Sequence, residues 1–260
     1  MAIAVHSSEP SFLFFWNNKV ASRSILTALG EAFPGLRVYA QPSFRPPVQD
    51  QDWPRFLVVR SPWARAASCY RNKCRDAMKA LERNGGLEPC QRHLLREAGA
   101  WPCRSLTGAR RLAELDFAEF VELLPGVRDG NSHFRLQVDV LRDAGSMTSR
   151  IPWAGRAART LLQLGRTHYL TPRLLKTRPT LAGDQAALAE GRKQSVRWLR
   201  LEDLPEAWGE VERALGRKIP LPWHARTAEG DDWQALYDAT LRERVAELYR
   251  PDLEMFGYDG

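Results

Sequence analysis

Short apolar runs and longer amphipathic stretches alternate along most of the chain. Runs of apolar and aromatic residues predict strands at 11–16, 36–40, 55–60 and 196–204. Apolar residues at helical spacing predict helices at 22–33, 62–83, 116–124, 205–215 and about 233–249. Strands that alternate with helices form parallel sheets with helices packed on their faces. The pattern therefore predicts an α/β protein with a mostly parallel central sheet of four or five strands, flanked by helices.

Three stretches carry weaker patterns. Residues 84–110 are rich in glycine, proline and arginine, which predicts a loop with at most a short helix. Residues 127–150 predict a loop and then a short helix or strand, and residues 153–194 predict a mainly helical, basic segment. A length of 260 residues suits one domain with an elaborated half. We therefore expect a single domain over 1–260 with a largely helical basic insertion at about 140–195.

The segment 56–74, FLVVRSPWARAASCYRNKC, places an arginine where a strand meets a helix. The apolar strand ends at Arg60, and the Ser-Pro that follows is typical of a helix N-cap and first helical position. The N-terminus of a helix binds anions readily because its first backbone N–H groups are unpaired. Ser61, Arg65 and Ser68 share one face of this helix. The segment therefore predicts an anion-binding site around Arg60.

A second strand, loop and helix occupy residues 11–30, SFLFFWNNKVASRSILTALG. The polar loop contains Lys19, and the helix after it is closed by Gly30. A lysine in a loop that opens a helix is the arrangement that holds phosphates in P-loop proteins. The glycine-rich Walker pattern is absent, so the sequence disfavours an ATP site. The residues expected to surround a phosphate here are Lys19, Val20, Ala21, Ser22, Arg23 and Ser24.

Positive charge is concentrated in the middle of the chain. The whole chain has 38 Lys and Arg against 31 Asp and Glu, a formal net charge of +7. Residues 150–200 hold eleven Lys or Arg against two acids, whereas residues 229–260 hold nine acids against three Arg. A basic protein favours an anionic partner. The middle of the chain is therefore the expected electropositive surface, where an anionic acceptor would bind.

The cysteines and the N-terminus bear on the expected compartment. Cys69, Cys74, Cys90 and Cys103 form no metal-ligand pattern, so we expect free or buried thiols in a reducing compartment. A Cys90–Cys103 disulfide is the alternative. The N-terminal sequence has no cationic stretch followed by an apolar one, and no run approaches 18 consecutive apolar residues. These observations predict a cytoplasmic protein without a transmembrane segment.

Both phosphate-binding candidates resemble segments of sulfotransferases that use 3′-phosphoadenosine 5′-phosphosulfate (PAPS). The stretch from Arg60 to Tyr70 resembles their 3′-phosphate segment, Arg-x-Pro-aromatic-x-Arg followed by a serine and an aromatic residue. The loop Asn-Lys-Val-Ala-Ser-Arg-Ser around Lys19 resembles the 5′-phosphosulfate loop of carbohydrate sulfotransferases. Ser22 stands there for the usual cysteine, and Arg23 for a small residue.

Two further segments extend the resemblance over most of residues 11–259. His133-Phe134-Arg135-x-Gln137 resembles the His-Trp-Arg-Pro-Gln of the family that includes the chondroitin 4-O-sulfotransferases. The blocks VRWLRLEDLPEAW and LRERVAELYRPDLEMFGYD resemble the family's C-terminal ending. The four segments also occur in the family's order. The chain is therefore similar to a soluble bacterial member of the carbohydrate sulfotransferase family.

The resemblance implies a fold, a reaction and roles for individual residues. The fold would be a three-layer, P-loop-like sulfotransferase domain. The reaction would move a sulfuryl group from PAPS to a hydroxyl, less readily an amine, of a carbohydrate, glycolipid or small-molecule acceptor, without a metal. Lys19 would hold the 5′-phosphate and neutralise the leaving oxygen, and His133 or an unidentified carboxylate would take the acceptor's proton. The residues implied to hold the donor elsewhere are Arg60, Arg65, Ser68 and Arg226.

Three other functions stay open at this stage. A P-loop-like nucleotide kinase would share the strand, loop and helix geometry, but neither a glycine-rich lysine loop nor a convincing set of metal-binding carboxylates is visible. A nucleic-acid-binding protein would explain the positive charge, but the basic stretch has no recognisable binding fold, so we expect no nucleic-acid partner. A sulfotransferase-like protein that binds the desulfated donor (PAP) without transferring sulfate is the third alternative.

Overall fold

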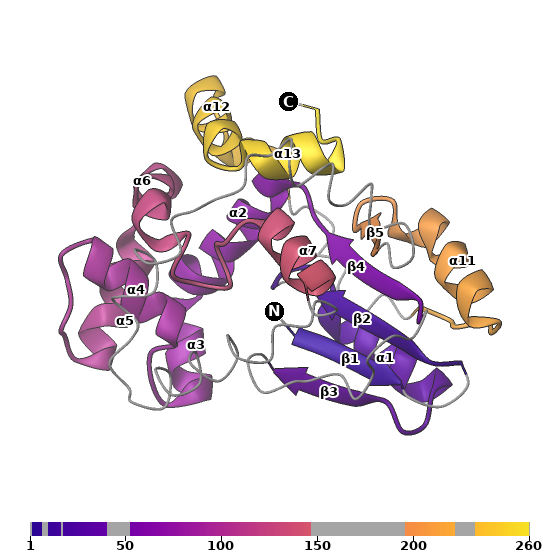
Figure 1. The fold of residues 1–260 in the computed structure, drawn as a ribbon. Helices are drawn as coiled ribbons and strands as arrows, with labels where there is room; N and C mark the ends of the chain where they lie inside the picture. The colour runs from indigo at the N-terminus through magenta and orange to yellow at the C-terminus, as the bar shows by residue number, and fades with distance from the viewer. Residues whose placement is uncertain are drawn as a thin grey trace.

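One mixed sheet organises the protein. The computed structural model describes residues 2–6, 10–16, 18–40, 53–146, 196–221 and 232–259. The sheet contains β1 (Ala2–His6), β2 (Phe12–Trp16), β3 (Arg37–Ala40), β4 (Arg55–Val59) and β5 (Arg197–Arg200), in the order β3-β1-β2-β4-β5 (Figure 1). Neighbouring strands β2, β4 and β5 are parallel, whereas β1 is antiparallel to both β2 and β3. The prediction of an α/β protein with parallel strands flanked by helices is confirmed.

Burial on both faces of the sheet explains why its central strands read as continuous apolar runs. All five residues of β2 and all five of β4 are buried. Alternate residues of β2 point to opposite faces, so that Leu13 and Phe15 join one core cluster while Phe12 and Phe14 join the other. On the second face pack α1 (Ser22–Ala32) and α11 (Leu204–Leu215). The first face is covered by the remaining helices, with α7 (Gln137–Ser146) drawn in front of the sheet (Figure 1).

The helix predicted at 62–83 is interrupted by a π-helical turn. It divides into α2 (Pro62–Tyr70), the π turn η1 (Arg71–Arg75) and α3 (Ala77–Asn84). The backbone N–H of Asp76 donates to the carbonyl of Arg71 over 2.8 Å, which is the wider spacing of a π helix. The turn shifts the register of the side chains that follow and places Lys73 in the interior, with 4% of its surface exposed.

The prediction of a loop at 84–110 is wrong. This region contains α4 (Pro89–Glu97) and the beginning of α5 (Ser105–Glu114). Glu88 precedes α4 as its N-cap, and its backbone N–H donates to Gln91 Oε1 over 2.9 Å. The glycine and proline content suggested a loop, but Pro89 occupies the first helical position, where proline is favourable. Gly108 is required by packing, since a Cβ there would lie 2.8 Å from a methyl group of Leu87.

The other predicted helices differ from the observed ones mainly at their ends. Asp116 caps α6 (Phe117–Val127) as predicted, but the helix continues past Pro125 because the backbone N–H of Arg128 donates to Leu124 over 2.8 Å. The last helix, predicted at about 233–249, contains the 3-10 turn η2 (Gln234–Leu236) and then α12 (Ala239–Leu248), and a further helix that was not predicted follows, α13 (Arg250–Phe256).

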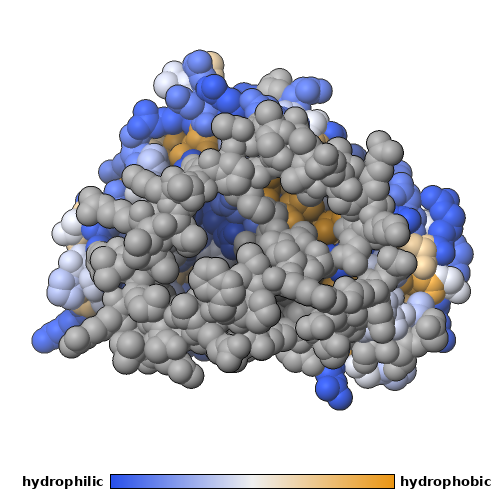
Figure 2. All heavy atoms as spheres, in the orientation of Figure 1, coloured by the Kyte–Doolittle hydropathy of each residue, from blue (hydrophilic) through white to orange (hydrophobic). Residues whose placement is uncertain are grey.

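The structure describes only part of the predicted basic insertion. Residues 147–195 and Arg226 lie outside the described residues. Among the described residues, no helix is long and apolar enough to span a membrane. Among the residues that carry a hydropathy colour in Figure 2, hydrophilic ones predominate around the rim of the view. The large apolar side chains exposed in the described segments are Val38, Leu106 and Trp198.

Candidate active site at the ends of the parallel strands

The candidate site lies where three parallel strands end. The chain leaves β2 at Trp16 and enters the Lys19 loop, and it leaves β4 at Val59 and reaches Arg60. Pairing of Trp16 with Val58 brings these two carboxyl ends side by side. In open α/β sheets, ligands bind in the crevice beyond the carboxyl ends of the strands. The fold therefore brings the two predicted phosphate-binding segments to the position where such a site is expected.

The Lys19 loop has an unusual backbone for a sequence without glycine. Lys19 has a φ of 69° and Ala21 a φ of 54°, both in the left-handed region that non-glycine residues rarely adopt. Strained conformations of this kind tend to occur at ligand-binding sites. No side chain caps α1 after Ala21, and no acid lies in its first turn. The residues at the start of α1 itself therefore provide no acceptor or negative charge for its first N–H groups.

Two side chains around this loop have no partner in the part of the chain that the structure describes. The hydroxyl of Ser24 is buried and makes no hydrogen bond to these residues. In the described part of the chain, the ammonium of Lys19 makes no hydrogen bond or ion pair. Burial lowers the pKa of Lys19, and the nearby ammonium of Lys73 lowers it too, while Cys69, Glu88 and Cys90 oppose the change. An anion at this position would restore the solvation that Lys19 loses on burial.

Arg60 lies beside the loop and is fixed by its backbone. Its N–H donates to Gln137 Oε1 over 2.9 Å, and Gln137 Nε2 donates to the carbonyl of Arg60 over 2.7 Å. The guanidinium donates from Nη1 to the carbonyl of Lys19 over 3.3 Å, and its other donors contact no acceptor in the described segments. Burial lowers the pKa of Arg60, opposed by Glu202. Arg60 thus has donors available for a ligand beside Lys19.

His133 reaches the same site from a turn before α7. The carboxamide Oδ1 of Asn131 accepts from the backbone N–H of His133 over 2.9 Å, which fixes the turn. The ring nitrogen Nδ1 is buried and has no hydrogen-bond partner in the described segments. Burial lowers the pKa of His133 to about 3, and the ammonium groups of Lys73 and Lys19 add to the effect. The imidazole is therefore neutral at physiological pH and can accept a proton.

Arg65 is placed differently from Arg60. Its guanidinium is 3% exposed and lies 3.7 Å from a carboxylate oxygen of Asp252. It also donates to the carbonyl oxygens of His133, over 3.2 Å, and of Arg135, over 2.5 Å. Arg65 therefore connects α2 to the His133 turn and to α13. Direct donor binding by Arg65 stays a prediction, and the contacts indicate a role in holding the His133 turn.

The remaining predicted donor ligands occupy varied positions. Ser68 is half-buried on α2, Ser22 is half-buried at the start of α1, and Arg23 is exposed. The side chain of Val20 is fully buried in the second core cluster, so only its backbone can face a ligand. Arg226 lies outside the described residues.

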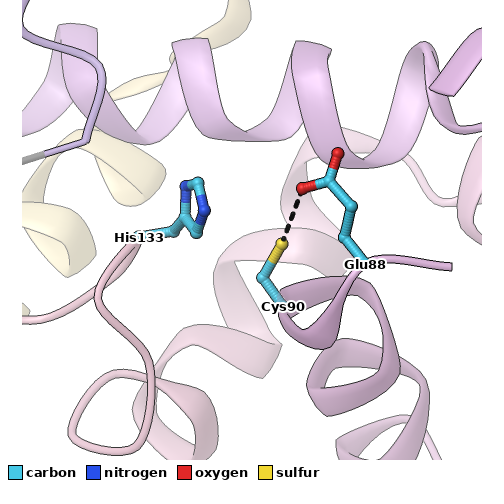
Figure 3. A group of neighbouring side chains, drawn as sticks. All are labelled: Glu88, Cys90 and His133. Carbon is cyan, nitrogen blue, oxygen red and sulfur yellow. Dashed lines mark hydrogen bonds between the residues drawn. The ribbon is translucent and has the colours of Figure 1, made fainter. Parts of the chain in front are cut away.

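The site also contains an ion pair between Lys73 and Glu88 that the sequence did not predict. Lys73 Nζ donates to Glu88 Oε2 over 2.5 Å, and the Cys90 thiol lies 3.6 Å from the same oxygen. Glu88, Cys90 and His133 place their ligand atoms within 4.8 Å of one another (Figure 3). The sequence contains one indication of this part of the site. Glu88 directly precedes Pro89 and stands three residues before Gln91, a pattern typical of a helix start.

The residue types at Glu88, Cys90 and His133 would suit a soft divalent cation, but their surroundings do not. The Lys73 ammonium already binds the carboxylate, and Lys19 adds a second positive charge nearby. Burial raises the pKa of the Cys90 thiol to about 12, so this side chain is protonated rather than an anionic ligand. The cysteines Cys69, Cys74, Cys90 and Cys103 are all free thiols, so the alternative Cys90–Cys103 disulfide is not formed.

Comparison with known proteins adds no family assignment. The chain matches no protein-family model, and neither curated proteins nor solved structures gave a significant match. The resemblance to carbohydrate sulfotransferases therefore stays a prediction, to be judged on the geometry of the site.

Proposed function

We propose that the protein is a PAPS-dependent sulfotransferase with the three-layer, P-loop-like fold of that class. The observation that supports it best is the meeting of the strained Lys19 loop, Arg60 and His133 at the carboxyl ends of β2 and β4. A donor with phosphates at both ends needs two separate cationic segments, and this site has them. The acceptor would be a carbohydrate, glycolipid or small molecule with a free hydroxyl, less readily an amine.

The balance of charge favours an anionic ligand in this site. Lys73 is paired with Glu88, and Arg65 lies beside Asp252. Lys19 and Arg60 have no ion-pair partner in the described segments. Two partly buried cations without ion-pair partners are costly unless anions compensate them. The 5′-phosphosulfate would compensate Lys19, with additional hydrogen bonds from the Ser24 hydroxyl and the first N–H groups of α1, and the 3′-phosphate would compensate Arg60.

These residues suggest a mechanism for sulfuryl transfer. The acceptor oxygen forms a bond to sulfur while the bond between sulfur and the 5′-phosphate oxygen breaks. The electron pair of the broken bond stays on the phosphate oxygen, where Lys19 stabilises the growing charge, and PAP leaves. The acceptor's proton passes to the neutral imidazole of His133, which later returns it to solvent. Catalysis of this kind consists mainly of positioning and charge stabilisation.

A PAP-binding protein without transfer activity remains a second candidate because of one observation. The low pKa of His133, about 3, makes the imidazole a weak base in the empty site. The transferase proposal requires the negative charge of the bound donor to raise this pKa. Turnover with an acceptor separates the two candidates, and binding of PAP alone is expected of both.

Thermal unfolding with and without PAP tests the proposed function. PAP should raise the melting temperature without added metal, and a hundredfold excess over Kd corresponds to about 2.7 kcal/mol of added stability. Adenosine 5′-phosphate, which lacks the 3′-phosphate, should stabilise less because the contacts at Arg60 are lost. Lys19→Ala should reduce the stabilisation by PAP. Lys79→Ala, which removes an exposed lysine on α3, is the matched control and should respond to PAP as the wild type does. Folded protein that shows no shift with millimolar PAP, or that responds only to ATP with magnesium, would contradict the proposal.

A further inference from the structure

The carboxylate of Glu88 is held firmly at the edge of the site. Lys73 binds Oε2 over 2.5 Å from the π turn, and the amide of Asn84 donates to Oε1 over 3.2 Å. The backbone of the π turn is itself anchored, because Gln91 Nε2 donates to the carbonyl of Lys73 over 3.1 Å. Burial raises the pKa of Glu88, but the hydrogen bond and charge of Lys73 outweigh it and lower the pKa below its usual range. Glu88 is therefore ionised at neutral pH.

His133 lies within reach of this carboxylate. A carboxylate oxygen of Glu88 and a ring nitrogen of His133 lie within 4.8 Å of each other. Figure 3 shows the imidazole beside the Cys90 thiol and the Glu88 carboxylate, with one ring nitrogen on the side that faces them. The buried Nδ1 of His133 has no hydrogen-bond partner among the described residues. At this separation the carboxylate acts on the imidazole through its charge.

The charges that act on His133 do not favour its protonation. Lys73, Lys19 and Arg65 all oppose a positive charge on the imidazole, and Glu88 favours it. When a neutral base takes a proton, it becomes an imidazolium among these cations. The bound donor would neutralise the charge of Lys19, whereas Glu88 lies close to the ring whether or not the donor is bound. The carboxylate is thus placed to stabilise the charge that the reaction creates.

We propose that Glu88 is a positioning residue for His133, and that Lys73 holds Glu88 in place for this role. The ionised carboxylate orients the imidazole and stabilises the imidazolium that forms when His133 accepts the acceptor's proton. The catalytic meaning of this pair rests on the proposed function. The charge coupling between Glu88 and His133 does not, so it can be measured in the protein without donor or acceptor.

The experiment follows the protonation of His133 in the full chain labelled with carbon-13 histidine. The His133 signal is assigned by its loss in His133→Gln. It is followed by NMR from about pH 8 to about pH 3, or to the lowest pH at which the protein stays folded, with and without PAP. The variants are Glu88→Gln, which keeps an acceptor for its hydrogen bonds, and Lys73→Met. Glu82→Gln is the control, because Glu82 is an exposed glutamate on α3. Melting temperatures verify that each variant is folded.

Glu88→Gln should decrease the charged fraction of His133, and Lys73→Met should increase it, each moving the midpoint by roughly one pH unit or more. If the wild-type signal does not titrate in this range, the comparison is made in Lys73→Met, where adding Glu88→Gln should reduce the charged form. In the folded background in which His133 titrates, an unchanged or greater charged fraction after Glu88→Gln would overturn the inference. Absence of PAP binding would count against the proposed function alone, since the titration without PAP would still report the coupling.

Discussion

Arg60 donates a hydrogen bond from Nη1 to the main-chain carbonyl of Lys19 over 3.3 Å. One predicted phosphate-binding residue therefore helps to fix the backbone of the other, although they are separated by 41 positions in sequence. The contact joins the ends of two parallel strands, β2 and β4. It orients the loop so that Lys19 adopts a left-handed backbone without the usual glycine. The two phosphate-binding segments are thus one structural unit rather than two independent sites.

We expect Arg60→Ala to weaken PAP binding by roughly 2–5 kcal/mol, because it removes both a desolvated charge and a constraint on the Lys19 loop. Arg60→Lys should recover only part of this loss, since an ammonium keeps the charge but not the planar set of donors. Isothermal titration calorimetry measures both. Arg213→Ala, an exposed arginine on α11, is the control and should bind PAP as the wild type does. Equal affinity of Arg60→Ala and Arg213→Ala for PAP would exclude Arg60 from the donor site.

Lys19 has a left-handed backbone, with a φ of 69°. Two substitutions at this position should therefore have the same effect on PAP affinity but different effects on stability. Both Lys19→Ala and Lys19→Gly remove the ammonium and should lose PAP affinity to a similar extent. Glycine adopts this conformation without strain, so Lys19→Gly should be more stable than Lys19→Ala by roughly 1 kcal/mol. Urea unfolding gives the stability and calorimetry the affinity. A glycine variant less stable than the alanine variant would show that the loop is not strained as described.

Much of the sheet could be predicted because its central strands are buried on both faces. The apolar runs that contain Phe12–Trp16 and Arg55–Val59 admit few other interpretations. The short run in β1 was missed because polar residues follow it closely at the N-terminus. The helix α4 was missed because glycine, proline and arginine in the surrounding sequence outweighed its apolar residues Leu94 and Leu95.

The candidate site was predictable only in part. The Lys19 loop and Arg60 could be found because a strand leads directly into each of them. The pairing of Lys73 with Glu88 could not, because it depends on the π turn, which no local pattern in the sequence announced. The contacts of Arg65 with Asp252 and with the His133 turn join residues far apart in the chain. Helical spacing alone placed Arg65 on the same face as Ser61 and did not reveal this burial.

Asp252 is expected to be essential for stability. Its carboxylate accepts from the backbone N–H groups of Gln137 and Val138, both over 2.9 Å, and lies 3.7 Å from Arg65. Asp252→Asn would leave the buried guanidinium uncompensated and should lower the free energy of unfolding by roughly 3–5 kcal/mol. Adding Arg65→Met should restore part of the loss. Urea titrations measure each variant beside Asp203→Asn, an exposed control, and similar stabilities of the two single variants would refute this role.

In contrast to Asp252, Ser24 should contribute to PAP binding and not to folding stability. Its hydroxyl is buried without a partner among the described residues, so Ser24→Ala should leave the protein equally stable or slightly more stable. A hydrogen bond to a charged phosphate contributes about 1.5–3 kcal/mol, so PAP binding should weaken by roughly tenfold to a hundredfold. Calorimetry and urea unfolding test both effects, with Thr27→Ala on the exposed side of α1 as the control. A loss of stability with unchanged PAP affinity would assign Ser24 a structural role.

His133 should make folding stability depend on pH in a defined direction. Burial lowers the pKa of the folded imidazole to about 3, whereas an unfolded histidine titrates near 6.5. Between these values the unfolded chain binds a proton that the folded chain does not, so stability rises with pH in this window. The contribution is fully present above about pH 6.5 and is lost progressively as the pH falls toward 3.

His133→Gln, which removes the titrating group, should therefore flatten the fall in stability below about pH 6.5. Urea unfolding of the wild type and the variant at several pH values gives the slopes, and comparison of slopes remains valid even if the variant is less stable throughout. Saturating PAP should also flatten the wild-type slope, because its negative charge beside Lys19 favours the imidazolium in the folded state. Parallel pH profiles of wild type and His133→Gln would mean that the folded imidazole titrates normally and that the site is more hydrated than its burial indicates.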